Sequence, residues 1–148
     1  MTKQHSISIE AEKKLKEKGK LKDVEQKFHE KIEELKKKKY VVEKQPWSEP
    51  PTKIKRKIGR LLTLRQSNFP FKMFVLQEVF LEEEKEPEIR LGYYIVSPKT
   101  LIEKGKLRLV WGQYNPNIPK KDFIELVRIA QEKGIIKQGV LNSFTISS

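Results

Sequence analysis

The sequence predicts an α+β protein: an N-terminal charged helix, then a small antiparallel sheet packed with a C-terminal helix. Three observations predict it. Apolar residues recur at helical spacing between residues 21 and 35, and segments rich in aromatic and β-branched residues follow from residue 69. A proline-started amphipathic segment then runs from residue 119 to residue 134. The sheet is expected to have three strands, or four if the C-terminal tail adds one.

Charge and proline content divide the 148-residue chain into three parts. Residues 1–44 are expected to form a charged helical extension, residues 45–51 (QPWSEPP) a proline-rich linker and residues 52–148 an α+β domain. The helix of the extension is expected from about Leu21 to Tyr40. Its apolar stripe consists of Leu21, Val24, Phe28, Ile32 and Leu35.

Residues 52–66 fit both the period of a helix and the period of a strand. A helix would place Ile54, Ile58 and Leu61 on one side, whereas a strand would align Ile58 with Leu62 and Leu64. The helix is favoured, and the strand remains the alternative.

Three strands are expected after this segment. The first, Phe69–Leu81, is apolar on both parities and is therefore expected to be buried on both faces. The next two contain RLGYYIV (Arg90–Val96) and RLVWGQY (Arg108–Tyr114), each with an internal glycine. Glycine weakens a strand, so both positions require a structural reason.

The composition favours a polyanionic partner. The net charge is +12, and residues 1–60 hold 19 lysines and arginines against 10 acidic residues. Such an excess favours nucleic acid, DNA or RNA, because lysine and arginine release counterions from phosphates. The absence of cysteine excludes disulfides, thiolate zinc sites and cysteine nucleophiles. Without a long apolar run or a signal-peptide core, the protein is expected to be cytoplasmic, with no membrane partner.

The basic run from Pro50 to Gln77 contains no acidic residue. A folded basic segment of this kind suits contacts with phosphates. The alternative is a surface that only keeps the protein soluble. The candidate phosphate contacts are Lys53, Lys55, Arg56, Lys57, Arg60 and Arg65.

The glycine-bearing strands supply a second candidate surface. If they pair without a bulge, alternation predicts that both glycines lie on one face with two arginines and two tyrosines. That face would be open to a nucleobase or a phosphate backbone, or the C-terminal helix would cover it. The candidate contacts are Arg90, Tyr94, Arg108 and Tyr114.

The function expected from the sequence is a non-enzymatic nucleic-acid-binding or nucleoprotein-accessory protein. Neither His5 nor His29 has a visible partner for general-base chemistry, and no catalytic residue, metal site or cofactor is expected. Whether the protein is an enzyme is left open, and a protein without enzymatic activity is favoured. One alternative is a protein-interaction or oligomerisation module that uses the Leu21–Leu35 stripe. The other is a small nuclease that uses Glu83 and Arg128. The sequence is assigned to no family.

Overall fold

The computed structural model describes residues 9–10, 13–15, 21–45, 48–50, 52–80, 87–112 and 117–137. The fold is α+β, as the sequence predicts, but within these residues the antiparallel sheet has five strands rather than three or four. The elements are α2 (Leu21–Lys37), β1 (Tyr40–Gln45), β2 (Thr52–Arg65), β3 (Lys72–Phe80), β4 (Glu88–Val96), α3 (Pro98–Lys104), β5 (Leu109–Trp111) and α4 (Lys120–Glu132).

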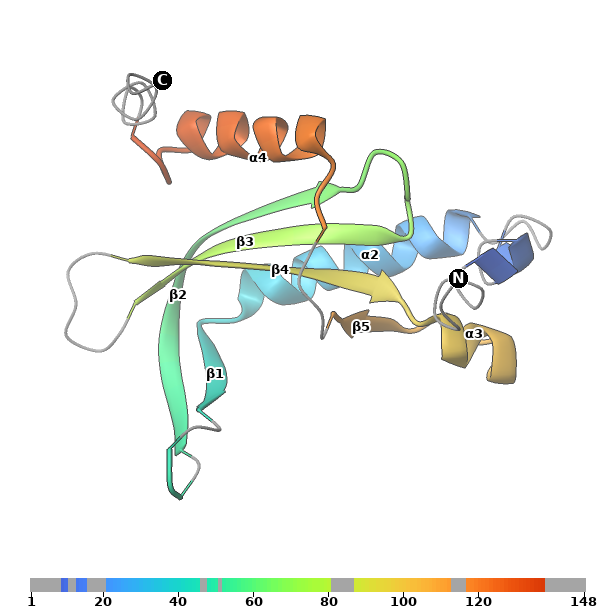
Figure 1. The fold of residues 1–148 in the computed structure, drawn as a ribbon, viewed down its shortest axis with the longest axis horizontal. Helices are drawn as coiled ribbons and strands as arrows, with labels where there is room; N and C mark the ends of the chain where they lie inside the picture. Colours follow the sequence, from blue (N-terminus) through green and yellow to red (C-terminus); the bar gives the residue numbers. More distant parts are fainter. Residues whose placement is uncertain are drawn as a thin grey trace.

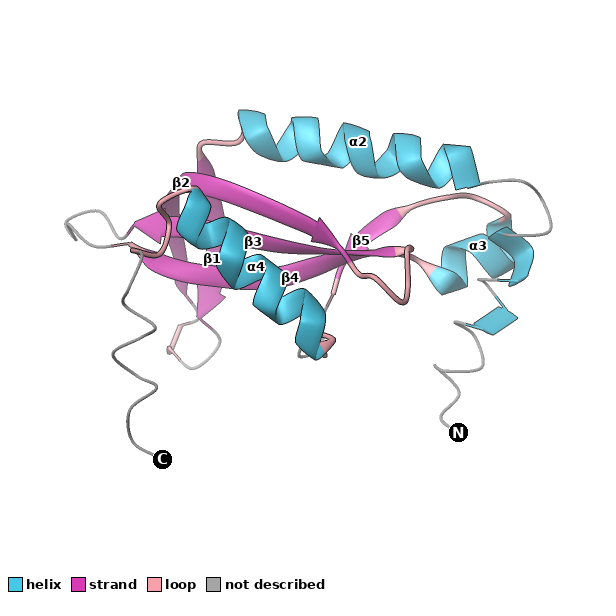
Figure 2. Ribbon diagram, turned by 90° about the horizontal axis from the view of Figure 1, so that it is seen from above, coloured by secondary structure: helices cyan, strands magenta, loops and turns pink. Residues whose placement is uncertain are grey.

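The strands lie in the sheet in their order along the chain, so that β1 and β5 form its edges. Helix α2 lies along one face of the sheet and α4 against the other (Figures 1 and 2). Strand β3 lies at the centre and is buried on both faces, as predicted. Its side chains alternate between the two cores, which the two helices close.

Each helix closes a separate hydrophobic core. On the α2 side, Phe28 is fully buried with Met73 and Val75 of β3. On the α4 side, Leu126 and Ala130 pack in one cluster with Phe74 and Tyr93. Burial of one large apolar side chain contributes about 1.5–3 kcal/mol, so these two clusters hold both helices on the sheet.

The N-terminal helix ends earlier than the sequence predicts. It stops at Lys37, and residues 40–45 form the edge strand β1 instead of the end of a helix. The segment Tyr40–Val42 consists of residues that favour strands, and it pairs antiparallel with Lys55–Lys57 of β2. The sheet therefore includes residues of the predicted helical extension.

The preference for a helix in residues 52–66 is wrong, because residues 52–65 form the long strand β2. The pairing register of β2 with β3 shifts between Ile58 and Leu61. A bulge of this kind inserts an extra residue, so the side chains that follow change face. This change of parity breaks the alternating pattern and explains why the sequence also fitted a helical period.

The first half of β2 projects from the main sheet together with β1 (Figure 1). We call this two-stranded ribbon, Tyr40–Gln45 with residues 52–57, the arm. Its tip, at Ser48–Pro50, is tied by the hydroxyl of Ser48, which accepts a hydrogen bond from the backbone N–H of Thr52 (2.9 Å).

The two glycine-bearing strands do pair, but in a register that separates their glycines. Tyr94 lies opposite Trp111, and Val96 lies opposite Leu109. Cross-strand partners share a face, so Gly92 and Gly112 lie on opposite faces of the sheet. The prediction of one face holding both glycines is therefore wrong.

Each glycine provides room for an aromatic ring from the neighbouring strand. A Cβ atom on Gly92 would lie 2.1 Å from Cζ2 of Trp111, and one on Gly112 would lie 2.0 Å from Cζ of Tyr93. Gly112 also donates a backbone hydrogen bond to the carbonyl of Tyr93 (2.8 Å). Both glycines are thus required by packing between β4 and β5.

We predict that Gly92→Ala lowers the free energy of unfolding by about 1–3 kcal/mol, because the added methyl group would overlap the Trp111 ring. Chemical denaturation measures this change. In a double-mutant cycle with Trp111→Leu, the two single variants should together lose more unfolding free energy than the double variant loses. A Gly92→Ala variant as stable as the wild type would contradict the close approach of the ring.

Candidate nucleic-acid interface

Strand alternation separates the six basic residues that the sequence placed in one run. Lys53, Lys55 and Lys57 lie on one face of the arm and are exposed. Arg56 lies on the other face, and Arg60 and Arg65 follow beyond the arm. The structure therefore brings together only half of the predicted phosphate contacts.

The outer face of the arm is basic. Lys44 of β1 lies directly opposite Lys53, Val42 opposite Lys55, and Tyr40 opposite Lys57. We call this surface the lysine face: Lys44, Lys53, Lys55 and Lys57 with Tyr40 and Val42. Its lysines are exposed, and among the described residues none forms an ion pair with a carboxylate.

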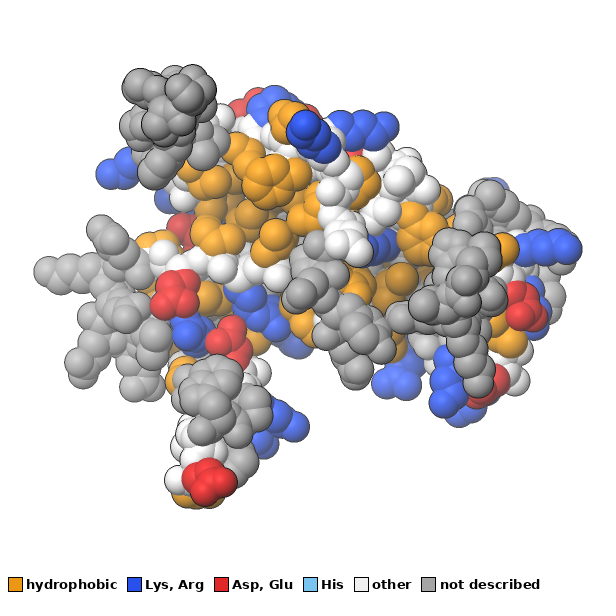
Figure 3. Space-filling view, viewed as in Figure 1, with side chains coloured by type: hydrophobic (Ala, Val, Ile, Leu, Met, Phe, Trp, Pro, Cys, Tyr) orange, Lys and Arg blue, Asp and Glu red, His pale blue; other side chains and the backbone are white. Residues whose placement is uncertain are grey.

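The lysine face also exposes apolar surface. Tyr40 is 49% exposed and Val42 57%, and the ammonium of Lys55 lies 4.1 Å from the centre of the Tyr40 ring. Figure 3 shows basic side chains along one side of the arm. Positive charge beside an exposed aromatic ring is the combination that can contact both the backbone and the bases of a nucleic acid.

The three arginines of the predicted run are engaged within the fold. The guanidinium of Arg56 pairs with Glu43 and Glu88, each at 3.0 Å. Arg60 donates a hydrogen bond to the carbonyl of Lys133, just after α4, at 2.6 Å. These two arginines therefore join segments of this chain.

Arg65 fastens α2 to β2. Its guanidinium donates hydrogen bonds to both carboxylate oxygens of Glu25, at 2.7 and 3.2 Å, and to the carbonyl of Pro70 at 2.9 Å. It also lies 3.9 Å from the centre of the Phe28 ring. A bidentate pair that is stacked on an aromatic ring is a structural contact.

The other face of the curled sheet contains a pocket of about 350 Å³, to which all five strands and α2 contribute. We call it the concave pocket. It is lined by Leu35, Lys38, Tyr40, Val41, Val42, Ile58, Gln77, Arg90, Tyr94 and Trp111. Two of the sequence-predicted contacts, Arg90 and Tyr94, lie together here.

Arg90 is held in place by three neighbours. It donates a hydrogen bond to the side-chain oxygen of Gln77 (2.8 Å), and its guanidinium carbon lies 4.3 Å from the centre of the Trp111 ring. Its Nε atom lies 3.5 Å from the Glu43 carboxylate. Burial lowers the pKa of Arg90 from its ordinary value, and Glu43 acts in the opposite direction. The guanidinium remains charged because arginine is not deprotonated in proteins.

Tyr94 contacts both Trp111 and α2. Its ring meets the ring of Trp111 edge to face, with the centres 5.0 Å apart, and the Lys31 ammonium lies 5.0 Å from its centre. Burial raises the pKa of the Tyr94 hydroxyl, while Lys31 and Arg90 oppose that shift. The hydroxyl therefore stays protonated at neutral pH and can donate a hydrogen bond.

The remaining predicted contacts lie elsewhere. Arg108 precedes β5 and lines a different depression, of about 220 Å³, with Lys27 and Lys31 of α2. Tyr114 lies outside the described residues. The alternative in which the C-terminal helix covers the Gly92 face is also wrong, because Trp111 covers Gly92 and α2 packs on that side of the sheet.

Three residues of the two candidate surfaces were not predicted from the sequence: Gln77, Trp111 and Lys44. Gln77 stands within an apolar strand, Trp111 is not among the predicted contacts, and Lys44 lies in the predicted helical extension, beyond the end of its expected helix. Their places depend on the register of β1 and β5, and no pattern within a single segment indicates that register.

The apolar stripe of α2 is used within the chain. Val24 is 1% exposed, Phe28 0% and Leu35 5%, all in the core beneath the helix, where Ile32 also packs. The side chain of Leu21 lies outside the described ones. The protein-interaction alternative would therefore require α2 to leave its own sheet.

The nuclease alternative gains no support. Arg128 is paired with Glu125 and Glu132 on α4, and Glu83 lies outside the described residues. Within the described ranges, no three or more histidine, aspartate or glutamate side chains gather in a way that could hold a metal ion.

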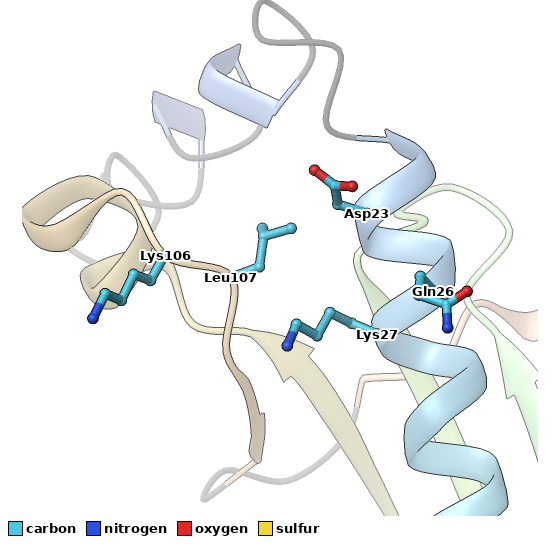
Figure 4. A pocket seen from close by; sticks show the side chains of 5 residues that line it. All are labelled: Asp23, Gln26, Lys27, Lys106 and Leu107. Atoms are coloured by element: carbon cyan, nitrogen blue, oxygen red, sulfur yellow. The ribbon is translucent and has the colours of Figure 1, made fainter.

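A further depression, of about 440 Å³, lies between the start of α2 and the loop after α3. Figure 4 shows Asp23 and Lys27 extending from the helix on the side of Leu107 of the loop, while Gln26 lies over the helix and Lys106 points away. Every polar side chain here is exposed, so this depression lacks the fixed polar groups of the concave pocket.

No helix among the described residues has the length and apolar character needed to cross a membrane. Comparison of the chain with protein-family models, with curated proteins and with solved structures finds no match in any of the three.

We predict that Arg65→Gln lowers the free energy of unfolding by about 1–2 kcal/mol, because it removes the link between α2 and β2 and the packing on Phe28. Lys55→Gln, at an exposed position on the lysine face, should change it by less than about 0.5 kcal/mol. Urea denaturation of both variants tests whether Arg65 stabilises the fold while Lys55 does not. Equal losses in the two variants would contradict it.

Proposed function

We propose that the protein binds nucleic acid, without catalysis, through the lysine face of the arm. The observation that carries this proposal is the gathering of Lys44, Lys53, Lys55 and Lys57 on one exposed face of a projecting ribbon. No described carboxylate pairs with any of them. A polyanion is the partner that such a surface fits.

The energetics of the arm support the same proposal. Like charges directly opposite each other destabilise a pair of strands, and Lys44 lies opposite Lys53. A phosphate backbone would relieve this repulsion, and its binding would release counterions. The free energy lost to repulsion in the free arm would thus be recovered in the complex.

The shape of the arm also suits a nucleic acid. Two paired strands lie about 4.8 Å apart, and a ribbon of this kind fits a DNA major groove about 12 Å wide. Lysines on alternate residues of β2 recur every 6–7 Å or so along the strand, which lets several of them contact one backbone. Contacts with phosphates alone would carry no sequence information.

The test is a salt titration of binding to single- and double-stranded DNA and RNA. The wild-type chain should bind with strong dependence on salt concentration. The triple variant Lys53→Gln, Lys55→Gln, Lys57→Gln should bind more weakly. The slope of log affinity against log salt concentration should shrink by about three, since each lost phosphate contact removes about one unit.

The matched control is Lys99→Gln, Lys104→Gln, Lys106→Gln, which removes the same charge from exposed lysines around α3. These residues lie at the far end of the molecule from the arm (Figure 1). The control variant should keep most of the wild-type slope of log affinity against log salt concentration. No detectable binding at low ionic strength would overturn the proposal, and an equal effect of the two triple variants would remove the arm as the site.

A further inference from the structure

We propose that the concave pocket accepts one unpaired nucleobase of a nucleic acid held by the lysine face, an inference that rests on the proposed function. The protein would then prefer nucleic acids that contain an unpaired nucleotide to fully paired duplexes. Five observations support this: the position of the pocket, its walls, its hydrogen-bonding groups, its charges and the cost of freeing a base from a duplex.

The pocket and the lysine face meet at β1. Tyr40 lines the pocket and also carries the ammonium of Lys55 over its ring at 4.1 Å. Because β1 is an edge strand, none of the strands that the structure describes lies beyond it to separate the two faces of the arm. A backbone bound along the lysines therefore passes within reach of the pocket.

The walls of the pocket suit a planar ring with polar edges. Its volume of about 350 Å³ lies at the lower end of the range for small-molecule sites. Trp111 and Tyr94 supply aromatic surface, and the Arg90 guanidinium, held on the Trp111 ring, supplies a further plane. Unstacked bases are bound on aromatic rings and on arginine planes in this way.

Hydrogen-bonding groups converge on the same space. Gln77 is only 2% exposed, and its side-chain oxygen fixes Arg90 through a 2.8 Å hydrogen bond. The Tyr94 hydroxyl, protonated at neutral pH, adds a donor. Polar groups held in fixed positions in a pocket orient a ligand and select its edge pattern.

The charges around the pocket favour a neutral group over a phosphate. Arg56 and Arg90 are offset by Glu43 and Glu88, which lie 3.0–3.5 Å from them. The Lys38 ammonium at the mouth lies 3.8 Å from Glu34. The phosphates therefore have a better site on the lysine face, where no described carboxylate pairs with the lysines, and the neutral base is the part that suits the pocket.

Filling the pocket requires a base that is free of its pairing partner. Extraction of a base from a duplex costs unstacking and unpairing energy, whereas a bulged or single-stranded base is already free. The protein should therefore distinguish nucleic acids by whether they contain an unpaired base rather than by their overall charge.

The experiment compares a blunt duplex with the same duplex carrying one bulged nucleotide, in RNA and in DNA, by fluorescence anisotropy with the full chain. The wild type should bind the bulged form about tenfold more tightly, as expected for stacking of one base. The ratio of the two affinities is compared within each variant, so that general changes in affinity cancel.

Two variants alter the pocket in different ways. Arg90→Lys keeps the charge but removes the planar group on Trp111, and Val41→Phe narrows the pocket from β1. Each should reduce the preference to about twofold or less. Arg128→Lys makes the same substitution on the outer side of α4 and should retain the tenfold preference. Thermal unfolding establishes that each variant is folded, and Val41→Phe provides the test if Arg90→Lys is not.

The outcomes separate this inference from the function on which it rests. Salt-dependent binding with equal affinity for the two duplexes would overturn the pocket proposal and leave the lysine face standing. A preference that survives in both pocket variants would also overturn it. Absence of binding to either duplex at low salt would overturn both proposals.

Discussion

The bulge in β2 is the constraint on which both candidate surfaces depend. Between Ile58 and Leu61 the strand gains a residue, and the backbone N–H of Arg60 donates to the carboxylate of Glu78 at 3.1 Å. Glu78 is only 8% exposed, so this hydrogen bond satisfies a backbone donor that the bulge removes from the ladder. The same carboxylate lies 3.5 Å from the Arg60 guanidinium, which in turn reaches the end of α4.

The change of parity at this bulge decides where the charges lie. Before it, the lysines of β2 point to the outer face and Arg56 to the concave face; after it, Leu62 and Leu64 enter the core beneath α4. In a regular strand the odd-numbered lysines and the even-numbered leucines would point to opposite faces, so the extra residue is what lets both point to the α4 side. The irregularity thus allows one strand to serve both a polar arm and an apolar core.

The pairs formed by each glycine and an aromatic ring illustrate a second role for register. Gly92 lies within β4 and Gly112 directly follows β5, and each receives a ring from the other segment, on opposite faces of the sheet. The contact of Trp111 with Gly92 brings the indole onto the concave face, where it supports Arg90. A packing requirement therefore builds one wall of the proposed binding pocket.

The sequence by itself determined the α+β class, the helix that begins at Leu21, the central strand buried on both faces and the basic excess toward the N-terminus. These follow from local periodicity and composition, which each segment carries in its own residues. Tertiary structure decided that residues 52–65 are a strand, that Lys44 belongs with Lys53, and that Arg90 meets Gln77 and Trp111. Each of these depends on which residues pair across strands, and pairing is fixed by contacts between segments distant in the chain, since a shift of one residue reverses every side chain.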